Sequence, residues 1–173
     1  MFKYWQSISK VSVITLLLLG ISGTALTNFV SLKSSDSAIA QNSRSSEARA
    51  IERLKNSGKR WIEIRVRSQR LLAWQGNKLV YGVIVSTGKG DTPTPSGVFS
   101  IQNKYRTARM QGEDYNVPDV PHVMYYSGNY AIHGAYWHRS FGIPVSHGCT
   151  NVAPDHAAWL YRWASVGTPV VVN

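Results

Sequence analysis

The residues that could do chemistry gather in the segment 133–151, which opens with His133 and ends with the run Ser-His-Gly-Cys-Thr-Asn at 146–151. Cys149 is the only cysteine in the chain, so no disulfide can form within it. A thiol is a poor nucleophile until it ionises, and a neighbouring imidazole can lower its pKa or take its proton. The pattern therefore favours a cysteine nucleophile, Cys149, with His133 as its base.

The neighbours of Cys149 suit acyl transfer. Gly148 places no side chain beside the sulfur, so a substrate carbonyl can approach and backbone N–H groups stay free to stabilise an oxyanion. His147 and Cys149 are two residues apart and would face the same side of a strand. His133 follows the apolar run 130–132, which predicts a strand that could lie beside the thiol. A lone cysteine is more often a small buried residue, but its combination with two histidines in one segment favours catalysis.

These residues together resemble the signature of the L,D-transpeptidase catalytic domain (YkuD-like). A second block agrees: the segment 85–89 and the Pro/Gly-rich loop 92–99 resemble the strand and loop that precede the active site in that family. The resemblance covers about residues 61–173. It departs from the family at Asn151, where many members carry arginine, so the contact made by this side chain is open.

The resemblance implies a mechanism on the peptide stems of bacterial peptidoglycan. The Cys149 thiolate attacks the carbonyl of the third stem residue, a diamino acid, and expels the terminal D-alanine. His133 takes the thiol proton and returns it to the leaving amine, while the backbone carbonyl of Gly134 orients its ring. An amine from a neighbouring stem then resolves the thioester and gives a 3→3 cross-link. Carbapenem-type β-lactams are expected to acylate the same sulfur.

The resemblance also assigns roles to the remaining residues of the motif. Backbone N–H groups at Gly148 and Cys149, helped by His147, would hold the oxyanion. Ser146 and Asn151 would position the loop or the substrate. The mechanism needs no cofactor and no metal ion.

Other functions remain open from the residues alone. If water resolves the thioester, the protein is an L,D-carboxypeptidase, and a third option on the same scaffold attaches an envelope protein to the wall. A zinc site could draw on His133, His138, His147 and Cys149, but their spacing matches no metal signature. A non-catalytic wall-binding module could use the six Trp and nine Tyr as a glycan platform, although it would have no need of the thiol.

Composition limits the class of partner. The formal net charge is +10 and hydrophobic residues make up 43% of the chain, which indicates a basic globular protein. Such a charge suits an anionic surface such as a cell envelope. Nucleic acid ranks low as a partner because no basic helix or zinc-finger pattern is present.

The N-terminal residues 1–40 are typical of a targeting segment. Lys3 and Lys10 precede the apolar run 11–30, and Ala38-Ile39-Ala40 offers a small-x-small cleavage pattern. The segment is either a cleaved signal peptide or a retained inner-membrane anchor, and both place the catalytic part in the periplasm or cell envelope. Residues 41–60 are predicted to form a polar linker with a short helix over 47–55.

Residues 61–173 are predicted to form a mostly β domain with one C-terminal α-helix. Alternating apolar and polar residues, β-rich runs and turn signals indicate strands, and Pro154 suits the first turn of a helix that runs to about residue 165. The β-sandwich arrangement is what the family resemblance implies. The predicted strands are 61–66, 71–74, 79–85, 98–101, 123–126, 130–132 and 170–172.

Overall fold

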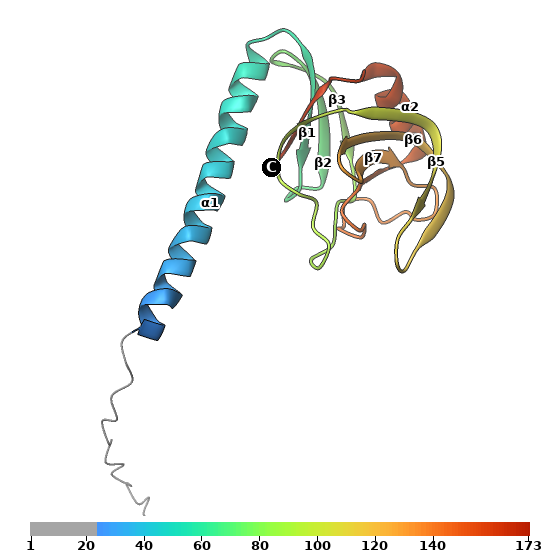
Figure 1. Cartoon of the computed structure of the whole chain (residues 1–173). Coiled ribbons are helices and arrows are strands. Elements are labelled where there is room, and N and C mark those ends of the chain that lie inside the picture. The colour runs from blue at the N-terminus through green and yellow to red at the C-terminus, as the bar shows by residue number, and fades with distance from the viewer. Residues whose placement is uncertain (1–23) are drawn as a thin grey trace, which may run out of the picture. The chain divides into compact units, whose positions relative to one another are not determined.

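A computed structural model describes the backbone from residue 24 to residue 173 and the side chains from residue 37 onward (Figure 1). The chain divides into two compact units, Met1–Asp36 and Ser37–Asn173. The first helix, α1, spans Thr24–Lys55. No helix within residues 24–173 combines the length and apolar character needed to cross a membrane. Much of the predicted targeting segment, including its most apolar part, lies outside the described residues.

The first sheet has five strands in the order β3-β2-β1-β9-β4. Strands β1, β2 and β3 follow one another as antiparallel neighbours, and the hairpin turn between β2 and β3 has Gly76 at a φ of 56°. The last strand of the chain, β9, lies parallel to β1 and antiparallel to β4. The strand bounds are Arg60–Arg65 for β1, Arg70–Gln75 for β2, Lys78–Ile84 for β3, Gly97–Ser100 for β4 and Pro169–Val172 for β9.

The second sheet has four strands in the order β5-β6-β7-β8, and helix α2 packs on β6 and β7. Apolar side chains of both sheets and of α2 form one core, so the two sheets make a sandwich (Figure 1). The predicted fold class, mostly β with a C-terminal helix, is confirmed. The bounds are Asn103–Gln111 for β5, Asn116–Ser127 for β6, Tyr130–Gly134 for β7, Thr150–Val152 for β8 and Pro154–Trp163 for α2.

The segment expected to be a polar linker is helical instead up to Lys55. The reason lies in the outer face of the first sheet, where Trp61 and Val171 point away from the main core. Ala50 packs against both of them, and all three side chains are buried. The predicted short helix 47–55 is therefore present as the part of α1 that covers these outward apolar side chains, and α1 also continues from there back to Thr24.

The hairpin of β5 and β6 is the largest departure from the strands predicted by sequence. Strand β5 was not predicted, and β6 begins at Asn116 rather than at 123. Prolines at 118 and 121 argue against a regular strand, and the chain accommodates them with positive φ angles at Asp119 (49°) and His122 (57°). This hairpin matters for function because its tip reaches the candidate active site.

Candidate active site

Two parallel strands bring His133 and Cys149 together. His133 lies on β7, and Cys149 immediately precedes β8. The register pairs Ile132 with Thr150 and His133 with Asn151. Cys149 is therefore one position before Thr150 and two before the partner of His133. This register puts His133 and Asn151 on the same face of the sheet. Cys149 lies just outside the strand, and its side chain lines the same pocket as those of His133 and Asn151.

The His133 ring is held in one orientation. Its Nδ1 donates a hydrogen bond to the carbonyl oxygen of Gly134 at 3.0 Å, and the ring stacks on Trp137 at 5.7 Å between centroids. A proton on Nδ1 leaves the lone pair of Nε2 free to accept the proton of a nucleophile. Desolvation by burial is the main reason why the pKa of His133 is lowered to about 4. The hydrogen bond with the Gly134 carbonyl raises this pKa, and the nearby His138 lowers it further. His133 is thus neutral at physiological pH.

The Cys149 thiol is also neutral in the free protein. Burial raises the pKa of the thiol above its ordinary value of 9.0, and the backbone of Ala131 opposes this only in part. The S–H group donates to the carbonyl oxygen of Asn129 at 3.6 Å. A neutral thiol and a neutral imidazole that line one pocket suit a mechanism in which the proton moves to His133 as the sulfur attacks.

A tight turn carries Cys149, whose side chain is half-buried at the pocket. Residues 147–149 form bends rather than a strand, so the expectation that His147 and Cys149 share a strand face is wrong. Gly148 has a φ of 106°, and this breaks the alternation. The Ser146 hydroxyl donates to the Cys149 carbonyl at 2.5 Å and accepts the Gly148 N–H at 3.1 Å. The backbone N–H groups of Gly148 and Cys149 are the predicted donors to the oxyanion. Since the Gly148 N–H already donates to Ser146, the Cys149 N–H is the one left for this role.

Gly148→Ala is expected to destabilise the turn. A Cβ at this position would lie 2.4 Å from Cε1 of Tyr130, and the φ of 106° disfavours any L side chain. The combined strain should lower the free energy of unfolding by about 2–4 kcal/mol. Urea unfolding checks this, with Gly128→Ala as the matched control. Gly128 also has a positive φ, 50°, but nothing lies within 4 Å of its added Cβ. Equal losses in the two variants would show that crowding by Tyr130 does not constrain the turn.

The His147 ring lies against the tip of the β5–β6 hairpin. Its Nε2 is 3.0 Å from Oδ2 of Asp114, and its ring stacks on Tyr115 at 4.7 Å between centroids. The hydrogen bond with His147 is the main cause that lowers the pKa of the Asp114 carboxyl. In this arrangement His147 holds the hairpin tip over the motif. Sequence pattern does not predict this contact. The His147 ring also lines the pocket, and its help in holding the oxyanion stays a prediction.

Asn151 braces the loop 135–145. Its side-chain amide lies 2.9 Å from Nε2 of His138, while Nδ1 of His138 accepts the N–H of Ser140 at 3.1 Å. The atom of Asn151 in this contact is Nδ2, so the pair links the end of β8 to the loop through His138. His138 and His147 therefore have different partners, Asn151 and Asp114. Among residues 37–173, no group of three His, Cys, Asp or Glu side chains could hold a metal ion.

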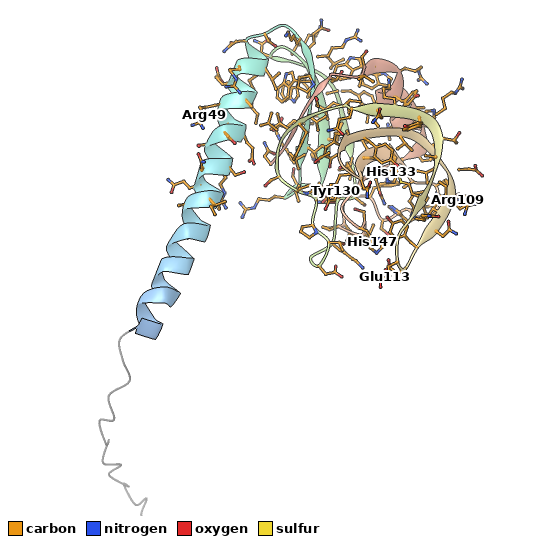
Figure 2. All side chains as sticks on the ribbon, in the orientation of Figure 1. Arg49, Arg109, Glu113, Tyr130, His133 and His147 are labelled. Carbon is orange, nitrogen blue, oxygen red and sulfur yellow. The ribbon has the colours of Figure 1, made fainter. Side chains whose placement is uncertain are left out.

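A pocket of about 220 Å³ opens over the sulfur. Five of the predicted site residues line it, whereas Gly134 and Gly148 are not among the lining residues. The side chains that sequence reasoning missed come chiefly from the β5–β6 hairpin, where Tyr115 and Val117 are two residues apart and so share a face. Figure 2 shows His133 and His147 in this region, with Glu113 at the hairpin tip below. The pocket is lined by Met110, Tyr115, Val117, His133, Trp137, His138, Val145, Ser146, His147, Cys149 and Asn151.

Acidification is expected to reduce stability through His133. The folded chain keeps this imidazole neutral down to a pKa of about 4, whereas an unfolded chain takes up the proton near 6.5. The neutral His133 therefore contributes about 3 kcal/mol to the free energy of unfolding. This contribution is complete above about pH 6.5 and is lost as the pH falls to about 4. Urea unfolding near pH 7 and near pH 4.5 checks this. His133→Gln, which lacks the imidazole, should lose about 2 kcal/mol less than the wild type over that interval. Equal losses would contradict the assignment.

Known proteins are similar to this chain in sequence and in fold. L,D-transpeptidase 1 of Mycobacterium tuberculosis is 37% identical over 100 residues, which are 50% of this chain and 39% of that protein. The chain thus spans well under half the length of this relative. An L,D-transpeptidase structure from Mycobacterium smegmatis matches with a TM-score of 0.63 and 29% identity, over 66% of this chain and 58% of that one. The structure of LD transpeptidase LdtMt1 in complex with imipenem matches with a TM-score of 0.62 and 27% identity, over the same shares, 66% and 58%.

The family model for the L,D-transpeptidase catalytic domain, YkuD, matches residues 59–172. This span holds both sheets, helix α2 and all the residues of the pocket. The chain belongs to the YkuD family of L,D-transpeptidase catalytic domains.

Proposed function

We propose that this protein is a peptidoglycan L,D-transpeptidase that forms 3→3 cross-links through a thioester on Cys149. The observation that supports this most is that His133 and Cys149 line the same pocket. The Gly134 carbonyl fixes the Nδ1 proton of His133, so Nε2 is the basic nitrogen on the pocket side. The proposed nucleophile and the proposed base line one pocket, and the Gly134 carbonyl orients the ring of the base, which supports acyl transfer.

Acylation begins when a tetrapeptide stem enters the pocket with the carbonyl of its third residue at the sulfur. His133 Nε2 takes the thiol proton as the C–S bond forms, and the carbonyl oxygen becomes an oxyanion near the Cys149 N–H. Collapse of this intermediate breaks the bond to the terminal D-alanine. The imidazolium gives its proton to the leaving amine, so His133 returns to the neutral form that its buried position favours.

Resolution of the thioester reverses these roles. The side-chain amine of a diamino acid in a second stem attacks the thioester carbonyl, and His133 takes a proton from this amine. The new amide bond links the third residues of the two stems, and the thiol leaves with its proton restored. The net charge of +10 is favourable for residence at an anionic cell wall.

Product analysis tests the proposal. The full chain is incubated with a disaccharide-tetrapeptide, with lysine- and diaminopimelate-containing stems in parallel, and the products are separated and weighed. Release of D-alanine together with a cross-linked dimer supports transpeptidation. Tripeptide without dimer would make the protein an L,D-carboxypeptidase instead. Binding to sacculi without any turnover would favour a wall-binding module.

We also propose that the protein acts in the periplasm or cell envelope. The support is the order of two lysines, Lys3 and Lys10, before the apolar run 11–30. Fractionation of cells that express the full chain tests the location, and the N-terminal sequence of the mature protein distinguishes cleavage after residue 40 from a retained inner-membrane anchor. Recovery of the uncleaved chain from the cytosol would overturn this proposal.

A further inference from the structure

The Pro/Gly-rich loop between β3 and β4 lies directly behind the catalytic turn. Its Thr94 is buried, and the Thr94 hydroxyl makes two hydrogen bonds of opposite direction. It accepts the N–H of Gly88 at 2.9 Å and donates to the carbonyl oxygen of Gly148 at 2.8 Å. The hydroxyl thus joins the start of the loop to the peptide that leads into Cys149.

The loop is built to hold Thr94 firmly. Prolines at 93 and 95 flank it, and a residue before proline is restricted to extended backbone. Gly88 approaches so closely that a Cβ there would lie 2.1 Å from the carbonyl oxygen of Thr92 and 2.6 Å from the Thr94 nitrogen. The Lys89 N–H also donates to the carbonyl of Ser146, at 3.0 Å. These contacts pin the loop to the catalytic turn around Thr94.

The Gly148 carbonyl and the Cys149 N–H belong to the same peptide unit. In a planar trans peptide these two groups point in opposite directions. Thr94 holds the carbonyl on the buried side, and Thr94 itself does not line the pocket, whereas Cys149 does. The Cys149 N–H therefore points away from Thr94 and from the loop that holds it.

The Cys149 N–H is also the donor that the turn leaves available. The neighbouring Gly148 N–H is taken by the Ser146 hydroxyl at 3.1 Å. Within residues 24–173, the Cys149 N–H has no hydrogen-bond acceptor. Gly148, with a φ of 106°, permits several orientations of the peptide that follows it, so an external contact is needed to select one.

We propose that Thr94 is a positioning residue for acylation, and that its hydroxyl fixes the Gly148–Cys149 peptide so that the Cys149 N–H can stabilise the oxyanion. This role rests on the proposed acylation of Cys149. The Thr94 hydroxyl touches neither substrate nor sulfur. It acts through the orientation of the peptide and has no direct part in the reactivity of the thiol.

The test compares two reactions of the same sulfur in the full chain. Acylation by a carbapenem passes through an oxyanion, whereas alkylation by iodoacetamide forms no oxyanion and reports only thiol reactivity. Thr94→Val removes the hydroxyl at nearly constant volume, and Thr94→Ser keeps it. Thr92→Val is the matched control, because Thr92 donates to the Ser146 carbonyl at 3.2 Å and leaves the Gly148 peptide untouched. If Thr94→Val has a lowered Tm, the same two rates are measured on Thr94→Ala instead.

The acylation rate constant of Thr94→Val is expected to fall roughly 10- to 100-fold. Its alkylation rate should change by no more than about twofold, and Thr94→Ser should restore acylation to within about threefold of wild type. Wild-type acylation in the Thr94→Val variant, a parallel fall in both reactions, or failure of serine to restore acylation would each overturn the proposal. An equal fall of acylation in Thr92→Val would do the same. If the wild type is itself not acylated, the proposed function fails rather than the role of Thr94.

Discussion

Cys149→Ala is expected to abolish acyl transfer while the chain stays folded. Removal of the nucleophile of an acyl-transfer enzyme lowers turnover by about 10⁴- to 10⁶-fold, because no covalent intermediate can form. The side chain is half-buried at the edge of a small apolar cluster with Val120, Val123 and Ala131. Its truncation should therefore reduce stability by only about 1 kcal/mol. Intact mass after incubation with a carbapenem measures the adduct, and urea unfolding measures the stability.

Cys149→Ser refines this test. The serine hydroxyl is close in size to the thiol but is far less readily deprotonated by an imidazole whose pKa is about 4. We therefore expect no adduct on the serine variant within the time in which the wild type is fully modified. An adduct of normal mass on Cys149→Ala would show that another residue is acylated, and this would contradict the assignment of the nucleophile.

His133→Gln is expected to lower the acylation rate near neutral pH by about 10²- to 10⁴-fold. The reason is that burial raises the pKa of the thiol above 9.0, so little thiolate exists at neutral pH without a base. The pH profile separates loss of the base from general damage. The wild-type rate should be flat from about pH 5, above the His133 pKa of about 4, to about pH 9. The variant's rate should instead rise about tenfold per pH unit as the thiolate forms.

His156→Gln provides the matched control for this variant. His156 lies on α2 outside the pocket, where its Nδ1 is 2.6 Å from the hydroxyl of Tyr81. Loss of this histidine should leave the acylation rate within about twofold of wild type. A flat pH profile in His133→Gln, with a rate equal to that of the control, would show that His133 is not the base.

Much of the fold was predictable from the sequence because it follows from simple periodicity. Strand β1 alternates Ile62 and Ile64, which enter the main core, with Trp61 and Glu63 on the other face. The turn at Gly76 and the helix that begins at Pro154 follow from local backbone preferences. These features were predicted correctly because each depends on residues close together in the chain.

The features that were missed depend on contacts between distant segments. The short helix 47–55 was predicted, but its packing on the outward Trp61 and Val171 and its continuation back to Thr24 were not. The β5–β6 hairpin carries prolines and many charges, which argue against strands. It is held in the second sheet because β6 also pairs with β7. Its contribution to the site, the contact of Asp114 with His147, joins residues 33 positions apart.

The site was predictable in its residue types but not in its hydrogen bonds. The motif indicates Cys149 and His133, and the side chains of both line one pocket. By contrast, the Ser146 hydroxyl occupies the Gly148 N–H, which the motif suggested was free. The Thr94 hydroxyl reaches the Gly148 carbonyl across 54 positions of sequence. These hydrogen bonds depend on the turn geometry at Gly148. The spacing of residues in the sequence does not predict that geometry.

The most direct test of the account is to locate the acyl group by peptide mapping. The full chain is incubated with a tetrapeptide stem, quenched in acid to preserve thioesters, digested and analysed by tandem mass spectrometry. The account predicts the mass of the stem less D-alanine on Cys149, and no such mass in Cys149→Ala. Release of D-alanine with the acyl group on another residue, or with no acyl-enzyme in the wild type at any quench time, would contradict it.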